Sequence, residues 1–208
     1  MEKRRSKLFL TFILTGTFLL AGLVFFGSLR IKEGTPQPES FASSVMPEEE
    51  RQTSVDVLAP NEKATLTMKA LRKLDGTLSQ TFFISLDAAK ESVEIYLHES
   101  NPSYQVLIPY NTFSPDNKYI FLKIDDPERP QYIVLRTDGK NIRGEEKLVE
   151  ITSLFYEKYD EFVITDVTGW GGYSLIVVNT NYKDGKIGPS FWFDLSNFGF
   201  IQLSNRFN

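Results

Sequence analysis

Residues 118–139 read KYIFLKIDDPERPQYIVLRTDG, and this stretch decides the fold of the chain. Two runs rich in β-branched and aromatic residues, 118–124 and 131–137, flank a short segment of Asp, Pro, Glu and Arg. Such runs are typical of strands, and the residues between them are typical of a turn. A connection this short cannot hold a crossover helix, so the two strands must be antiparallel neighbours. The stretch therefore predicts a β-hairpin.

The same alternation of strand-like runs and turn residues recurs throughout residues 62–208. Further strand-like runs cover 65–71, 80–86, 92–98, 104–108, 148–152, 161–167, 173–179, 190–195 and 200–203. Turn signals such as Asp-Gly and Gly-Gly separate them. Helical signal is weak and limited to a turn or so near residues 153–159, because no stretch keeps a 3.6-residue apolar period over three turns. The sequence predicts a mainly β, antiparallel domain.

An internal repeat divides this domain. Residues 80–86 align with 118–124, and a looser third copy lies in 173–195, where residues 179–189 predict a long polar hairpin loop. Four-stranded units are expected at about 64–108, 109–152 and 160–203. Four short antiparallel strands in so few residues is the pattern of a propeller blade.

The second unit carries a further motif. Residues 113–117 read FSPDN before one strand, and Asp138-Gly139 follow the next. This pattern resembles the WD40-like repeat of the TolB type, in which an F-S-P-D-G turn leads into a strand and a hairpin ends in a D-G turn. Asn117 stands where that repeat has Gly, and Asn also tolerates left-handed backbone. The resemblance implies a propeller-like scaffold for protein contacts and carries no catalytic residues.

The length of the domain limits this expectation. The first unit lacks the F-S-P-D turn, and the third has residues 167–170 (VTGW) in its place. Closed propellers need about four to eight blades, whereas residues 62–208 supply three. We therefore expect an array of propeller-like four-stranded units, with a β-sandwich or a larger β assembly completed by other subunits as alternatives.

Residues 8–29, LFLTFILTGTFLLAGLVFFGSL, contain no charged side chain. A helix of this length spans a bilayer core of roughly 30 Å. More basic residues precede the segment, in 1–7, than follow it, which favours a cytoplasmic N-terminus and an extracytoplasmic body. The sequence predicts a basic cytoplasmic tail at 1–7 and a single-pass signal anchor at 8–29 in the cell membrane. A cleaved signal peptide is the alternative, although its apolar run is usually shorter.

Residues 30–61 differ in composition from both neighbours. They contain four prolines, an acidic run at 48–50 and few apolar side chains. Proline breaks helices, and the small apolar surface of this segment cannot offset the conformational entropy that ordering would cost. We predict a disordered, acidic linker over 30–61.

Composition excludes several classes of protein. Among 208 residues, 23 are Lys or Arg and 27 are Asp or Glu, so the formal net charge is -4, and the chain has no Cys and one His. Disulfides and thiolate metal sites are therefore excluded, and an acidic chain is a poor nucleic-acid binder. We expect no cofactor, no metal and no nucleic-acid partner.

Few residues are candidates for chemistry. His98 could act as the base of a catalytic triad, but the chain has no G-x-S-x-G motif to supply the nucleophile. The acids Asp125, Asp126 and Glu128 lie in a predicted turn. Residues 168–173 read TGWGGY, in which Trp170 and Tyr173 form a candidate binding surface for a sugar or peptide. The alternative is a Gly-rich turn whose Trp caps the sheet core.

The function expected from these features is not enzymatic. A membrane anchor, a linker and a repeat-built β body predict an extracytoplasmic binding or scaffold protein, with a protein partner or self-association. A cell-envelope hydrolase that uses carboxylates, and a subunit that completes a larger β assembly, are the alternatives.

Overall fold

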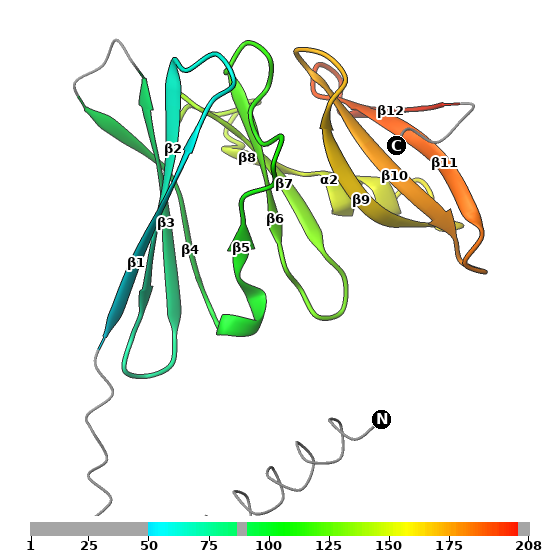
Figure 1. The fold of residues 1–208 in the computed structure, drawn as a ribbon. Helices are drawn as coiled ribbons and strands as arrows, with labels where there is room; N and C mark the ends of the chain where they lie inside the picture. Colours follow the sequence, from blue (N-terminus) through cyan, green and yellow to red (C-terminus); the bar gives the residue numbers. More distant parts are fainter. Residues whose placement is uncertain (1–49, 87–90, 204–208) are drawn as a thin grey trace, which may run out of the picture. The chain divides into compact units, whose positions relative to one another are not determined.

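The computed structural model describes residues 50–86 and 91–203 (Figure 1). The predicted tail and anchor, and most of the predicted linker, lie outside the described residues. Within the part of the chain that is described, no helix is long and apolar enough to cross a membrane.

The described chain folds into three four-stranded sheets. The first sheet contains β1 (Arg51–Leu58), β2 (Ala64–Arg72), β3 (Leu78–Leu86) and β4 (Ser92–Ser100). The middle sheet follows a 3-10 turn at Pro102–Tyr104 and contains β5 (Val106–Leu107), β6 (Tyr119–Ile124), β7 (Gln131–Arg136) and β8 (Leu148–Glu150). Helix α2 (Ile151–Tyr156) leads to the last sheet, formed by β9 (Phe162–Trp170), β10 (Leu175–Tyr182), β11 (Ile187–Asp194) and β12 (Gly199–Gln202).

Within each sheet, strands that follow one another in the chain pair antiparallel. The mainly β, antiparallel fold and the division into three four-stranded units are therefore confirmed. The hairpin predicted from residues 118–139 is the β6–β7 pair, in which Tyr119 lies opposite Arg136.

The middle sheet is buried on both faces. Successive side chains of a strand point to opposite faces. Ile120 and Leu122 of β6 belong to the core shared with the first sheet, while Phe121 between them belongs to the core shared with the last sheet. Double burial explains why the strand runs in residues 118–139 are almost continuously apolar.

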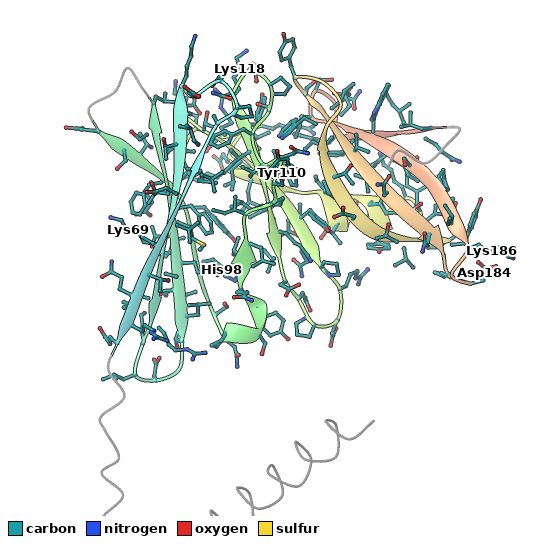
Figure 2. All side chains as sticks on the ribbon, in the orientation of Figure 1. Lys69, His98, Tyr110, Lys118, Asp184 and Lys186 are labelled. Atoms are coloured by element: carbon teal, nitrogen blue, oxygen red, sulfur yellow. The ribbon has the colours of Figure 1, made fainter. Side chains whose placement is uncertain are left out.

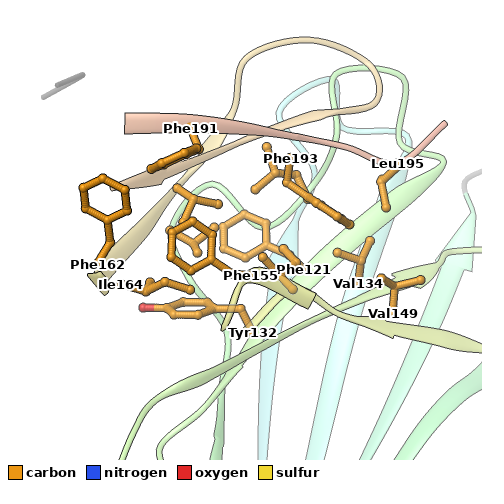
Figure 3. Close-up of a cluster of buried hydrophobic side chains, with 14 residues drawn as sticks. Phe121, Tyr132, Val134, Val149, Phe155, Phe162, Ile164, Phe191, Phe193 and Leu195 are labelled. Atoms are coloured by element: carbon orange, nitrogen blue, oxygen red, sulfur yellow. The ribbon is translucent and has the colours of Figure 1, made fainter. Parts of the chain in front are cut away.

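The core between the middle and last sheets is rich in aromatic rings (Figure 3). Phe155 of α2 is fully buried and meets the ring of Phe191 edge to face at 5.1 Å. Tyr156, also on α2, accepts a hydrogen bond from the backbone N–H of Ile164 in the edge strand β9, over 2.9 Å. The short helix therefore fills the core and covers part of an otherwise open sheet edge.

Two boundaries differ from those predicted. Residues 51–58, assigned to the linker, form β1, which pairs with β2 from Arg51↔Arg72 to Leu58↔Thr65. The side chains of β1 are mostly exposed, so backbone pairing rather than apolar burial holds this edge strand. Because the segment has few apolar residues, its sequence resembles that of a linker. Residues 104–108, assigned to the first unit, contribute β5 to the middle sheet instead.

A buried glutamine explains the position of β5. Val106 of β5 lies opposite Ile124 of β6 on one side. On the other side, the Gln80 side chain of β3 accepts from the Val106 N–H over 2.6 Å and donates to the Val106 carbonyl over 2.9 Å. The amide thereby substitutes for a neighbouring strand and links the first sheet to the middle sheet.

The last sheet and α2 bring two smaller corrections. The predicted polar loop at 179–189 is short, because β10 runs to Tyr182 and β11 starts at Ile187. Gly185, with φ 85°, supplies the left-handed residue of this tight turn. The strand predicted to end at residue 152 ends at Glu150, where α2 begins.

Candidate functional site

Turns of the first and middle sheets line an open pocket of about 660 Å³, which we call the turn pocket. Its lining residues are Asn61, Lys63, Leu86, Asp116, Asn117, Lys118, Arg136, Thr137 and Asp138. The β1–β2 turn and the end of β3 supply one wall, and the turns before β6 and after β7 supply the other. Figure 2 labels Lys118, on the second of these walls.

The turn before β6 is built by the Ser-Pro-Asp-Asn sequence. The Ser114 hydroxyl donates to Oδ1 of Asp116 over 2.8 Å and accepts from the Tyr119 N–H over 3.0 Å. Asn117 takes the left-handed conformation, with φ 58°. Burial acts to raise the pKa of Asp116, but hydrogen bonds from Ser114 and Lys118 outweigh it, so that pKa lies below its ordinary value.

The turn after β7 is built around a two-point ion pair. Arg136 donates from Nε and Nη2 to the two carboxylate oxygens of Asp138, over 2.9 and 2.6 Å. Asp138 also accepts the Lys140 backbone N–H over 3.1 Å. The Arg136 hydrogen bonds lower the pKa of Asp138 to about 2, against the opposing effect of burial. Both pocket carboxylates are therefore held ionised by their own turns.

Hydrogen bonds join the walls. The Asn117 side-chain amide donates to Oδ1 of Asn61 over 2.6 Å, which links the middle sheet to the first. The Thr137 hydroxyl donates to the Asn117 carbonyl over 2.7 Å. The two asparagines are thus held by a network that fixes the relative position of three turns.

The turn pocket is suited to binding a polar ligand. Arg136 and Lys118 pair with Asp138 and Asp116, whereas Lys63 has no ion pair within the described part of the chain. The carboxylates cannot donate protons near neutral pH, because both pKa values are lowered. The groups that remain are the amides of Asn61 and Asn117, held by their mutual hydrogen bond, and the exposed ammonium group of Lys63.

The two residues predicted to form a binding surface lie in different environments. Trp170 is half-buried between the last two sheets: its indole N–H donates to the Thr112 carbonyl over 3.1 Å, and its ring stacks on Tyr119. Tyr173, in the turn between β9 and β10, exposes 68% of its surface. Tyr173 is therefore the accessible member of the predicted pair, while Trp170 has the packing role given as its alternative.

The other residues considered for chemistry have structural partners. His98 lies 2.8 Å from the Tyr104 carbonyl through Nε2 and 3.3 Å from the Tyr96 hydroxyl through Nδ1. Asp126 accepts the Glu128 N–H over 2.9 Å within the β6–β7 turn. The described residues contain no cluster of His and acidic side chains suited to a metal ion.

Sequence reasoning identified the turns but not the pocket. The F-S-P-D-N and D-G motifs predict scaffold turns, and neither Asn61 nor Lys63 is among the residues predicted to form a site. Asn61 and Asn117 are 56 residues apart, so nothing local in the sequence indicates that they meet. No known family model matches the chain, and no curated protein is similar to it in sequence.

Proposed function

We propose that this protein is a membrane-anchored, extracytoplasmic binding or scaffold module whose turn pocket receives an extended segment of a protein partner. The observation that carries the proposal is the turn pocket itself. It is open to solvent, its polar groups are fixed by hydrogen bonds between turns, and its carboxylates are neutralised by their own cations. Such a surface binds without needing a catalytic group.

The expected ligand is polar and extended. Asn61 and Asn117 offer amide groups to a peptide backbone, which carries a donor and an acceptor at every residue. Leu86 supplies an apolar contact, and Lys63 supplies a positive charge for a carboxylate on the partner.

A propeller-like arrangement of the three sheets is part of the proposal. Two separate cores, one on each face of the middle sheet, support stacking of three sheets. A two-layer sandwich would have a single core between its sheets. Within this proposal, the apolar run at 8–29 anchors the body to the cell membrane with the body outside.

Charge reversal tests the proposal. Full-length chain carrying Lys63→Glu is compared with Lys183→Glu, an exposed lysine in the β10–β11 turn of the last sheet, in pull-downs from solubilised membranes. We expect at least one partner to be lost with Lys63→Glu and kept with Lys183→Glu. Equal partner recovery with wild type, Lys63→Glu and Lys183→Glu would contradict the role of the pocket.

A further inference from the structure

The edge of the first sheet formed by β1 has no neighbouring strand in the described part of the chain (Figure 1). β1 is eight residues long and pairs with β2 in unbroken register from Arg51 to Leu58. The side chains of this strand are exposed from Arg51 to Asp56 and again at Leu58. A long, regular and exposed edge strand is a template for pairing with a further strand.

The other sheet edges among the described residues are protected. Strands β8 and β12 are only three and four residues long. Strand β5 is two residues long, and Gln80 bonds both backbone groups of Val106. The pairings of β4 and β9 contain register shifts, and Tyr156 accepts the Ile164 N–H at the β9 edge. Short strands, bulges and covering side chains prevent edge pairing, and the described residues show none of these devices at β1.

The ladder between β1 and β2 determines which backbone groups face the open edge. The Ala59 N–H donates to the Ala64 carbonyl over 2.8 Å and so forms a hydrogen-bonded pair at the end of this ladder. Hydrogen-bonded and non-hydrogen-bonded pairs alternate in antiparallel sheets, so the odd-numbered residues of β1 bond to β2. The even-numbered residues turn their backbone N–H and carbonyl groups toward the open edge: Gln52, Ser54, Asp56 and Leu58.

We propose that β1 pairs antiparallel with β1 of a second copy of this chain, with Ser54 opposite Ser54 on the two-fold axis. This register places Gln52 opposite Asp56 of the second copy, on both sides of the axis. Asp56 accepts a hydrogen bond from Thr67 over 2.7 Å through one oxygen, and its other oxygen can accept from the Gln52 amide. The backbone groups at the edge then form about six hydrogen bonds between the copies. Such an isologous contact closes on itself.

Pairing about Ser54 also matches the side chains on the other face of β1. Val57 packs against the core of the first sheet, so the odd-numbered residues of β1 lie on the inner face. There Arg51 lies opposite Val57 of the second copy, and its methylene groups can cover that side chain. Thr53 lies opposite Val55, a pair of β-branched residues that suits cross-strand neighbours. The sequence of β1 is therefore complementary to itself, which favours a second copy over an unrelated segment.

The acidic side chains of β1 favour this register over its neighbours. Centring the pairing on Thr53 would put Asp56 directly opposite Glu50, which is exposed and precedes the strand. Centring it on Val55 would make the two Asp56 side chains diagonal neighbours. Both alternatives bring carboxylates together, and like charges on paired strands are destabilising. Only the central of these three registers keeps the carboxylates apart.

Disulfide formation tests both the contact and its register, because the chain has no Cys and one introduced thiol can only link two copies. Full-length Ser54→Cys in mild detergent is oxidised, since the facing Cα atoms would lie about 5.5 Å apart, within disulfide range. Gln52→Cys, also exposed on β1, is the matched control, because its two copies would lie about 14 Å apart. A mixture of Gln52→Cys with tagged Asp56→Cys places thiols opposite each other again.

We expect Ser54→Cys to yield several times more covalent dimer than Gln52→Cys, and the mixture to yield mainly the mixed dimer. Adding Gln52→Pro to Ser54→Cys removes an edge N–H that β2 does not use, so the dimer should fall to the control level with unchanged far-ultraviolet circular dichroism. Adding Gln52→Thr instead should leave most of the dimer. Equal yields from Ser54→Cys and Gln52→Cys would overturn the proposal, because association through another part of the chain would not distinguish these positions.

Discussion

The side-chain amide of Asn117 donates to Oδ1 of Asn61 over 2.6 Å, and this bond joins the middle sheet to the first sheet at the turn pocket. It connects the Ser-Pro-Asp-Asn turn before β6 with the turn between β1 and β2. Asn117 also has left-handed backbone, with φ 58°. One residue therefore sets the conformation of its own turn and its contact with the next sheet.

These two roles of Asn117 are separable by mutation. Asn117→Gly keeps the left-handed backbone and removes the amide, so it should cost about 1 kcal/mol or less of unfolding free energy. Asn117→Ala loses the amide and adds left-handed strain, which costs a further 1 kcal/mol or so. Urea unfolding of both variants measures the difference. Equal stability of the two variants would show that the turn is not held in the left-handed region.

Replacing Gln80 should destabilise the junction of the first and middle sheets. Gln80→Leu leaves the N–H and carbonyl of Val106 without the partners they have now, and each buried unsatisfied group costs roughly 1–3 kcal/mol. Gln202→Leu, at an exposed position on β12, is the control and should change stability by less than about 0.5 kcal/mol. Thermal unfolding of the two variants checks the prediction, which a Gln80→Leu protein as stable as the control would refute.

Phe155 holds the aromatic core between the middle and last sheets. Phe155→Ala should lower the free energy of unfolding by roughly 3–5 kcal/mol, because its ring is fully buried against Phe191 and Phe200. Tyr110→Ala is the matched aromatic control, since Tyr110 exposes 96% of its surface, and should be nearly neutral. Chemical denaturation followed by tryptophan fluorescence gives both values. A loss below about 1 kcal/mol for Phe155→Ala would mean that α2 does not close this core.

The Arg136–Asp138 pair predicts a pH dependence. The pKa of Asp138 is lowered from 3.8 to about 2 in the folded chain, chiefly by hydrogen bonds from Arg136. The pair therefore stabilises the fold fully above pH 3.8, and the contribution is lost as pH falls through about 2. Wild type should be more stable than Asp138→Asn at pH 7, and most of this difference should be lost by pH 2. Urea midpoints at several pH values test this, and a stability difference that did not shrink on acidification would contradict it.

The sequence predicted the fold well where local pattern decides it. Residues 118–139 predicted a hairpin because two strand-like runs flank a short turn. These runs are almost continuously apolar because the middle sheet is buried on both faces. The sequence did not predict β1. This exposed edge strand is held by backbone pairing, which does not require a particular pattern of side chains. Residues 104–108 were given to the wrong sheet because Gln80, a polar residue inside β3, decides where β5 lies.

The candidate site was harder to predict than the fold. Trp170 looked like part of a ligand platform because Gly residues surround it, yet its indole N–H is bonded to Thr112. The turn pocket depends on Asn61 meeting Asn117 and on two turns reaching the same end of adjacent sheets. Such contacts follow from the stacking of sheets, which a single sequence does not specify at residue level.

The central claim is that the turn pocket contacts a protein partner in the cell. Its most direct test is a photo-cross-linking amino acid placed at Lys63 of the full-length chain in intact cells. The control is the same probe at Leu74, an exposed residue of the β2–β3 turn, at the opposite end of the first sheet from the β1–β2 turn. We predict light-dependent adducts with a discrete protein from position 63 and none of that mass from position 74. The same adducts from both positions, or none from position 63, would contradict the account.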